Sequence, residues 1–123
     1  MKFGTVTIAA SLAITAFILP ATAMAGYEGA IAFSQRTGAS GWSKNYDTKN
    51  QASNAALNYC NADDCKVVYN FTNSCAALAA GPDGGYGVDW DVKKGRAERK
   101  AMRACENYSS GCQIVVSACS KNQ

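Results

Sequence analysis

Hydrophobic and polar residues follow the same order twice along this chain. Residues 29–74 and 75–120 carry matching patterns, and a repeat period of about 45 residues is typical of a duplicated supersecondary unit. In each copy, two short strand-like segments are followed by a run with apolar residues at helical spacing and then by a β-branched segment. The pattern therefore predicts the order strand, strand, helix, strand in both halves.

The two predicted helices share the spacing of their apolar residues. Small or apolar side chains stand at positions 52, 56, 59 and 60 of the first copy and at 97, 101, 104 and 105 of the second. Thr48 and Gln51 have the spacing of a capping box, which predicts where the first helix begins. The alanines on these faces would let each helix approach a sheet closely.

The predicted strands are separated by turn signals. Paired strand-like segments lie at 28–34 and 40–46 in the first copy and at 75–80 and 85–91 in the second. The sequence Gly-Pro-Asp-Gly at 81–84 is a strong turn signal between two of them. The closing strands centre on residues 67–69 and 114–116. We expect an α+β fold of two tandem ββαβ pseudo-repeats, with mostly antiparallel sheet covered by two helices.

The first 25 residues have the composition of a secretory signal peptide. A single Lys2 precedes an apolar run over residues 8–19, and Ala23 and Ala25 form a small-residue cleavage box. The apolar run is too short for a comfortable membrane span. We therefore expect cleavage near Ala25 and one secreted or periplasmic domain over residues 26–123, whose net charge falls from +3 to +2 with the loss of Lys2.

All six cysteines follow the predicted signal peptide and would enter an oxidising compartment. Six cysteines allow fifteen pairings, but the repeat narrows the choice, because in each copy one cysteine ends the helix and the next precedes the closing strand. The predicted disulfides are Cys60–Cys65, Cys105–Cys112 and Cys75–Cys119. A zinc site is disfavoured because the chain has no histidine and its local spacings are C-x4-C and C-x6-C. We expect no metal and no cofactor.

Several segments together resemble a family of bacterial secreted proteins. The matching segments are residues 30–34, the alanine-rich helix ending in Cys60, and residues 64–68, 73–79, 84–87 and 111–115 with Cys119. The combined pattern is similar to the domain of unknown function 4189 and covers nearly the whole predicted mature chain. The resemblance implies a small exported domain with paired cysteines, and it supplies no catalytic residues. One departure is that Lys93 and Lys94 stand where a threonine-type cap is expected for the second helix.

The sequence offers little catalytic chemistry. Without histidine there is no Ser-His or Cys-His pair, and paired cysteines leave no thiolate nucleophile. Asp89 and Asp91 alternate on one face of a predicted strand and are the candidates for a carboxylate-dependent hydrolase, while Asp63 and Asp64 lie in a short loop. A polar strand face and a solvated turn explain these carboxylates without a pocket, so we expect a non-enzymatic protein with no catalytic residue.

Four aromatic residues form the first candidate binding set. Trp42 and Tyr46 align with Tyr86 and Trp90 in the second strands of the two copies, with the i and i+4 spacing that places each pair on one strand face. Such a set would give a stacking platform for a sugar ring or a partner's side chains. The alternative is that these side chains build the core under the helices.

The second candidate binding set is basic. Arg96, Arg99, Lys100 and Arg103 fall on the predicted helix face opposite the alanines, whereas the equivalent face of the first helix carries no charge. A requirement of the fold would act on both copies, so this asymmetry points to function. The alternative is a charged face that is merely solvated.

These observations favour a secreted or periplasmic protein-interaction module of the inhibitor or immunity type. The expected partner is another protein or an anionic envelope polymer, and nucleic acid is disfavoured outside the cell. The first alternative is an exported effector or envelope-associated domain that binds host or cell-wall components. The second is a hydrolase acting through Asp89 or Asp91. The sequence does not predict an oligomeric state.

Overall fold

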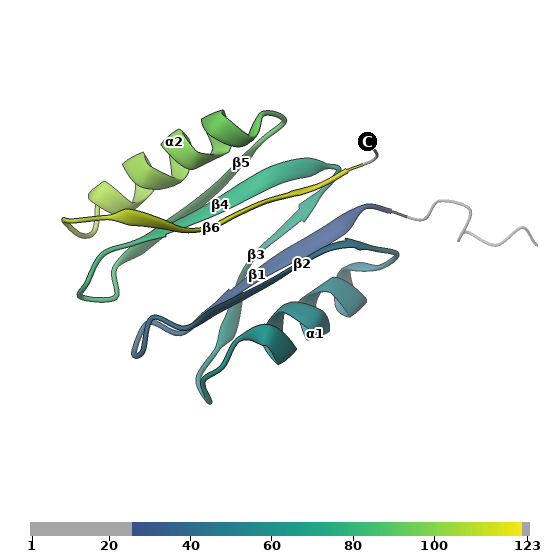
Figure 1. Ribbon diagram of the computed structural model, residues 1–123, viewed down its shortest axis with the longest axis horizontal. Coiled ribbons are helices and arrows are strands. Elements are labelled where there is room, and N and C mark those ends of the chain that lie inside the picture. The colour runs from purple at the N-terminus through teal and green to yellow at the C-terminus, as the bar shows by residue number, and fades with distance from the viewer. Residues whose placement is uncertain (1–25, 122–123) are drawn as a thin grey trace, which may run out of the picture.

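The computed structural model describes residues 26–121 and contains two helices and six strands in this part of the chain (Figure 1). The first copy forms β1 (Glu28–Phe33), β2 (Ser40–Tyr46), α1 (Lys49–Tyr59) and β3 (Lys66–Thr72). The second copy forms β4 (Ser74–Ala80), β5 (Tyr86–Asp91), α2 (Lys94–Glu106) and β6 (Gln113–Ser120). The predicted ββαβ order is confirmed in both halves.

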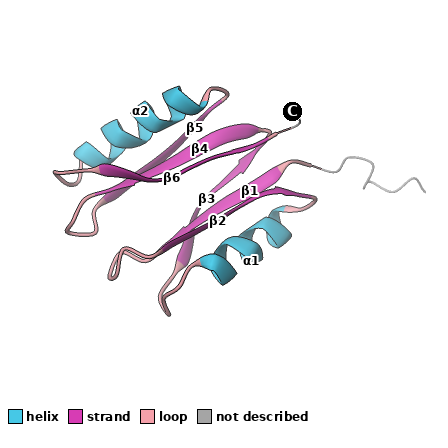
Figure 2. Cartoon of the chain, viewed as in Figure 1, coloured by secondary structure: helices cyan, strands magenta, loops and turns pink. Residues whose placement is uncertain are grey.

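Each half forms its own three-stranded antiparallel sheet, in the order β2-β1-β3 and β5-β4-β6. The two sheets face one another, and each helix covers the outer face of its own sheet (Figures 1 and 2). The predicted α+β class is therefore confirmed, with four layers in the order helix, sheet, sheet, helix. Across the sheet interface, β2 lies next to β6 and β3 next to β5.

The central strands β1 and β4 are buried on both faces. Ile31, Phe33 and Leu78 point between the sheets and form the main core with residues of β3 and β6. Ala30 and Ala32, on the other face of β1, meet the alanines of α1. Alternating large and small residues thus let the sheets interlock on one side and the helices approach closely on the other.

One glycine in each half lets the helix end rest directly on a strand. A Cβ added to Gly41 would lie 2.3 Å from the carbonyl oxygen of Ala56, and one added to Gly87 would lie 2.2 Å from the backbone nitrogen of Cys105. No side chain fits at either position. These glycines therefore correspond to one another and fix how β2 aligns with β5.

The two helices begin differently. Thr48 and Gln51 form the predicted capping box of α1, with both hydrogen bonds at 3.2 Å. Lys93 occupies the N-cap position of α2 and makes no side-chain capping bond. Instead, Asp91 accepts a hydrogen bond from the backbone N–H of Lys93 at 3.0 Å. The carboxylate of Asp91 thus partly offsets a first turn whose cationic side chains oppose the helix dipole.

All three predicted disulfides are present: Cys60–Cys65, Cys105–Cys112 and Cys75–Cys119. The first two join the end of each helix to the start of the following strand. The third joins two residues that face each other across β4 and β6. Disulfides of this number in so small a domain are typical of exported proteins.

The predicted signal peptide and its cleavage near Ala25 lie outside the described residues, so they stay predictions. Within residues 26–121, no helix has the length and apolar character needed to cross a membrane. That part of the chain also contains no cluster of histidine, cysteine or acidic side chains that could hold a metal ion.

Candidate binding site

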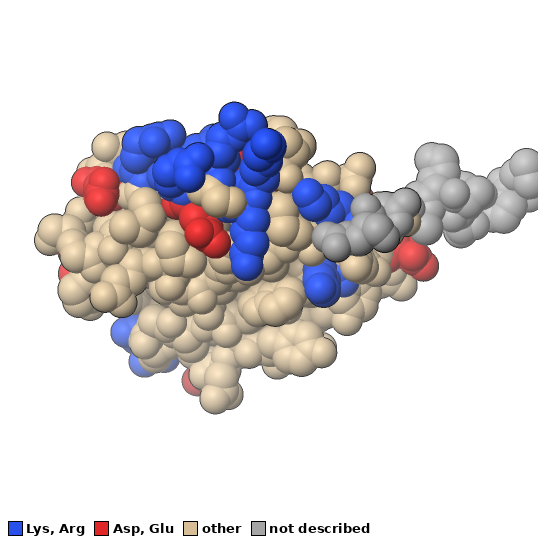
Figure 3. All heavy atoms as spheres, turned by 45° about the horizontal axis from the view of Figure 1, so that its top comes forward, with Lys and Arg blue, Asp and Glu red and all other residues tan. Residues whose placement is uncertain are grey.

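The outer surface of α2 is strongly basic. Six of the eleven Lys and Arg residues in 26–121 lie at positions 93–103, and Figure 3 shows basic side chains gathered over the helix. The matching positions of α1 are Gln51, Asn54, Ala55 and Asn58, which carry no charge. The two halves thus share a backbone plan but differ in surface charge.

Two of the four predicted basic residues bind carboxylates of the neighbouring strand. Arg96 Nε lies 3.3 Å from an oxygen of Asp91, and Lys100 Nζ lies 3.6 Å from Asp91 and 3.9 Å from Asp89. Lys100 also donates a hydrogen bond to the carbonyl oxygen of Trp90 at 2.7 Å. Arg96 and Lys100 therefore attach α2 to β5 as well as contributing positive charge.

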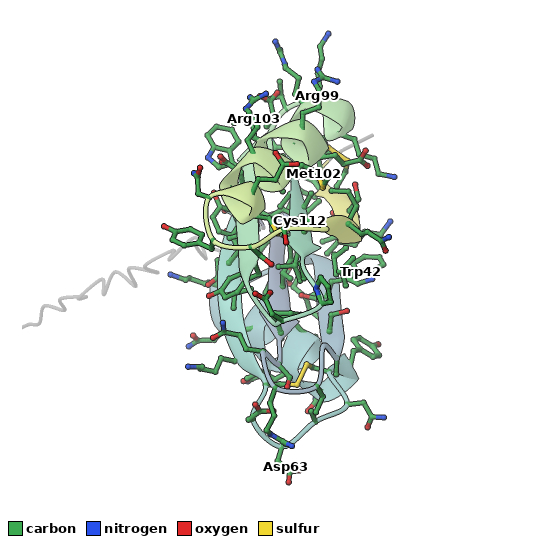
Figure 4. All side chains as sticks on the ribbon, turned by 90° about the vertical axis from the view of Figure 1, so that its left-hand side faces the viewer. Trp42, Asp63, Arg99, Met102, Arg103 and Cys112 are labelled. Carbon is green, nitrogen blue, oxygen red and sulfur yellow. A yellow bond between two sulfur atoms is a disulfide. The ribbon has the colours of Figure 1, made fainter. Side chains whose placement is uncertain are left out.

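The other two, Arg99 and Arg103, point away from the sheets at the outer edge of the molecule (Figure 4). Both are exposed, and neither forms an ion pair with any residue between 26 and 121. They are the members of the predicted set that are free to meet a partner.

The carboxylates considered for hydrolysis hold the backbone and the basic residues. The pKa of Asp91 is lowered mainly by the backbone N–H of Lys93; burial is the next largest effect and opposes the shift, and Arg96 and Lys100 lower the pKa further. Asp89 accepts a hydrogen bond from the backbone N–H of Trp90 at 2.8 Å. A lowered pKa keeps Asp91 ionised, whereas a general acid needs a raised one. These contacts indicate a structural role for Asp89 and Asp91.

One of the two loop aspartates also stabilises the fold. Asp64 accepts a hydrogen bond from the buried Ser34 hydroxyl at 2.7 Å and lies 3.7 Å from Arg36. The Ser34 hydrogen bond is the main cause of the lowered pKa of Asp64. Asp63 is exposed at the tip of the same loop (Figure 4).

The structure separates the four aromatic residues. Tyr86 packs against the core between the two sheets, with its ring centre 5.3 Å from that of Phe33, whereas the core alternative placed these side chains under the helices. Trp42 and Trp90 are exposed by 42% and 46% and lie at opposite open sides of the sandwich, next to β6 and β3 respectively. The ammonium group of Lys100 lies over the ring of Trp90, 5.4 Å from the ring centre. The four side chains therefore form no common platform.

The expectation that Trp42 and Tyr46 share a strand face is wrong. Asn45 has a positive φ of 60° and forms a β-bulge opposite Gly29. The extra residue moves Tyr46 to the side of β2 that faces α1, while Trp42 stays on the side that faces β6. Both still border a hollow along the free edge of β2, together with Tyr59.

The predicted alignment of the aromatic pairs is also shifted. Trp42 lies opposite Ile31 in β1, and Val88 lies opposite Leu78 in β4, so Trp42 corresponds to Val88. Tyr86 therefore corresponds to a position two residues before Trp42. The sequence pattern of the two copies aligned aromatic residues with aromatic residues. In the structure, the two glycines that contact the helices are the residues that correspond, and they define the register of β2 and β5.

A groove runs between β2 and β6 on one open side of the sandwich. We call it the lysine groove; its volume is about 370 Å³, and its lining includes Trp42, Lys44, Asn45, Lys94, Ser117 and Lys121. No acidic residue lines it. Figure 4 shows Trp42 on this side, between the levels of the two helices.

The pseudo-symmetric position on the opposite side, between β5 and β3, holds a smaller hollow of about 250 Å³. We call it the neutral groove; it is lined by Tyr69, Asn70, Phe71, Thr72, Ser74 and Trp90. No basic side chain lines it. The duplicated fold thus provides two grooves, and the lysines line one of them.

Comparison with known proteins places the chain in a family without an assigned activity. The family model described as "Domain of unknown function (DUF4189)" matches residues 29–119. The chain belongs to this family. The expected resemblance is thereby confirmed, and the family description names no activity.

One solved structure has the same fold as this DUF4189 domain. It is the NMR structure of Rv1813c from Mycobacterium tuberculosis, with 29% sequence identity and a TM-score of 0.58 over 92% of this chain and 98% of that one. No curated protein matches the chain. The comparisons therefore support the fold and family and leave the function to be argued from the structure.

The sequence analysis did not predict that three lysines of the DUF4189 domain line a groove. Lys44, Lys94 and Lys121 come from a strand, a helix start and the segment after the last strand, and they converge because the two sheets stack. Their spacing in the sequence carries no periodic signal. The bulge at Asn45 was the one local clue, since asparagine tolerates the left-handed conformation that a bulge often needs.

Proposed function

We propose that this chain is an exported, non-enzymatic binding module whose basic α2 face docks on an acidic surface of a partner protein, as an inhibitor or immunity protein would. The observation that carries the proposal is the contrast between the helices. Both pack on their sheets through buried alanines, yet the outer face of α2 alone is cationic. A property needed for folding would be expected on both.

Only part of the charge of α2 serves its own stability: Arg96 and Lys100 bind carboxylates of β5, whereas the lysines at the helix start form no ion pair within residues 26–121. Cations in a first turn oppose the helix dipole by about 0.3–1 kcal/mol each at exposed positions. The first half shows that the same fold accommodates a neutral helix with a capping box. A second helix without a side-chain cap and with Lys93, Lys94 and Arg96 at its start is thus better explained by recognition than by folding.

The disulfides supply the rigidity that such recognition needs. Cys105–Cys112 fixes the end of α2, and Asp91 and Asp89 hold Arg96 and Lys100 against β5. A surface that is already ordered loses little conformational entropy when a partner binds. Arg99 and Arg103 would then form new ion pairs with the partner's carboxylates.

The experiment uses a matched pair of variants. Immobilised protein produced by export of the full chain is exposed to envelope and extracellular extracts, and retained proteins are quantified by mass spectrometry. Arg99→Gln with Arg103→Gln should lose the specific partner, while Asn54→Ala with Asn58→Ala should retain it. Neither pair should change the urea midpoint appreciably, because all four side chains lie on outer helix faces.

Association kinetics with the captured protein then test the electrostatic mechanism. The wild-type association rate should fall as salt rises, and the Arg99/Arg103 variant should associate about tenfold more slowly at low salt. Equal rates for the two proteins at low salt would show that the α2 face is only solvated.

A further inference from the structure

We infer that the lysine groove is a binding site for an anionic sugar ring, which stacks on Trp42 while its carboxylate or phosphate contacts the surrounding lysines. The groove shares Lys94 with the start of α2, but it does not include Arg99 or Arg103 on the outer face of that helix. A result with Lys121, which lies outside α2, therefore neither supports nor weakens the protein partner proposed for that face.

The lining groups have complementary chemistry for such a ligand. Trp42 presents an indole that is 42% exposed, and the negative face of an aromatic ring attracts the C–H face of a pyranose. Lys44, Lys94 and Lys121 place ammonium groups around it with no lining carboxylate to compete. Asn45 adds a side-chain NH₂ donor for sugar hydroxyls, since its amide oxygen lies 3.2 Å from the Ser120 hydroxyl.

Polar groups at the groove keep bonding capacity for a ligand. Glu98 accepts a hydrogen bond from the Ser117 hydroxyl, so the serine oxygen in the groove can still accept one from a ligand. Lys121 donates one hydrogen bond to the carbonyl oxygen of Val92 at 2.9 Å and keeps two further N–H groups for a ligand. Cys119 is held in its disulfide and offers no reactive sulfur.

The groove is held in shape by contacts between the two sheets. Asn45, in its left-handed conformation, donates its backbone N–H to the hydroxyl of the buried Ser120 at 2.8 Å. Ser120 in turn donates to the carbonyl oxygen of Tyr27 at 2.8 Å. A strained non-glycine residue fixed by a buried hydroxyl is the kind of feature that is retained where it positions a site.

The neutral groove provides an internal comparison. The strand registers show which positions of the two grooves are equivalent. Ser74 in the neutral groove is equivalent to Lys121 in the lysine groove, and Trp90 is equivalent to the bulged pair Lys44 and Asn45. Lys49, the equivalent of Lys94 at the start of α1, does not line the neutral groove. Sheet stacking alone would therefore create two open-sided grooves without lysines, whereas lysines from both copies line one of the two grooves.

The size of the groove limits the ligand. A volume of about 370 Å³ lies near the lower end of the range for small-molecule sites, roughly 300–1,000 Å³. One or two sugar rings fit this size, either free or as part of an acidic polysaccharide. A carboxylated and a phosphorylated sugar share the chemistry that the groove recognises, and separate titrations distinguish them.

The experiment titrates the exported protein, with its disulfides intact, with digalacturonate, glucose 6-phosphate and the neutral disaccharide lactose. Binding is followed by ¹H–¹⁵N spectra. We expect at least one anionic sugar to shift the amides of the lysine groove and the indole N–H of Trp42, and to bind about tenfold or more tightly than lactose. Shifts confined to other residues, or equal affinity for lactose, would overturn the inference.

Matched variants test the role of the lysines. Lys94→Gln and Lys121→Gln should each weaken binding of the anionic sugar by about tenfold, since each removes a charge-assisted hydrogen bond. Lys49→Gln, at the equivalent helix start of the first copy, should change the affinity less than twofold. Trp42→Phe should weaken binding of the ring more than Trp90→Phe does.

A folding check accompanies each variant, because an unfolded protein would also lose the ligand. All these side chains are at least partly exposed, so each spectrum should keep the dispersion of the wild type. Well-folded Lys94 and Lys121 variants that retain wild-type affinity would refute the site. Loss of sugar binding with unchanged capture by the Arg99 and Arg103 face would establish the two surfaces as independent.

Discussion

Replacing Gly87 by alanine should destabilise the domain severely, although it adds a single methyl group. The new Cβ would lie 2.2 Å from the backbone nitrogen of Cys105 and 2.6 Å from the carbonyl carbon of Ala104. Heavy atoms in contact prefer separations of about 3.5–4.0 Å, so the end of α2 would have to rise from β5 by about 1 Å or more. Both obstructing atoms belong to backbone and cannot rotate away.

The cost follows from what that movement would open. Ala77, Ala79 and Ala101 are fully buried between α2 and its sheet, and the Cys105–Cys112 disulfide limits how far the helix end can retreat. Overpacking of a core costs about 1–3 kcal/mol, and a clash with backbone belongs at the upper end, about 3 kcal/mol. In a domain of this size, that loss lowers Tm by at least about 12 °C.

Urea unfolding with the disulfides intact measures the effect, and another glycine supplies the control. Gly95 lies in α2, where an added Cβ would have 3.7 Å to the nearest side-chain atom, so Gly95→Ala should raise stability by about 0.5–1 kcal/mol. Gly41→Ala should repeat the loss in the first half. A Gly87→Ala variant within about 0.5 kcal/mol of the wild type would refute the inferred contact between helix and strand.

Two further predictions concern the start of α2 and the loss of stability at low pH. Lys93→Thr should raise the free energy of unfolding by about 1 kcal/mol in urea, because it supplies a side-chain cap to α2; an unchanged or lower value would contradict the assigned N-cap. The pKa of Asp83 is lowered from 3.8 chiefly by the Ser109 hydroxyl and then by the Gly85 N–H, so its stabilisation is complete above pH 3.8 and is lost as pH falls below that value. Asp83→Asn should therefore be less stable than the wild type at pH 6, and the difference should shrink towards pH 2; a constant difference across this range would contradict the assignment.

The elements of the fold were predictable because the chain repeats them. Thr48 indicated the start of α1, and the alanines at helical spacing indicated both buried helix faces. The cysteines that end each helix and precede the next strand indicated two disulfides, which left Cys75 to pair with Cys119. The helix spacing and the disulfide from helix end to strand start are local features that recur in each copy. The stacking of the two sheets depends on contacts between distant segments and left no such local pattern.

The candidate sites were predictable to different degrees. The basic face of α2 followed from helical spacing, but the engagement of Arg96 and Lys100 by β5 depends on which residues of that strand face the helix. The aromatic set failed because the bulge at Asn45 inserts a residue that no alternation pattern reveals. The lysine groove could not be foreseen, because its walls come from β2 and β6, which meet through sheet packing.

The connection between the halves has a consequence for binding stoichiometry. Each disulfide lies within one half, and the single residue Asn73 separates β3 from β4. The arrangement is that of a closed twofold dimer in which the C-terminus of one subunit is joined to the N-terminus of the other. A true homodimer would repeat every surface and would carry two cationic grooves. In the tandem chain the two halves can differ in sequence, so this domain keeps the rigid interface of a dimer while it offers a ligand one lysine groove per molecule.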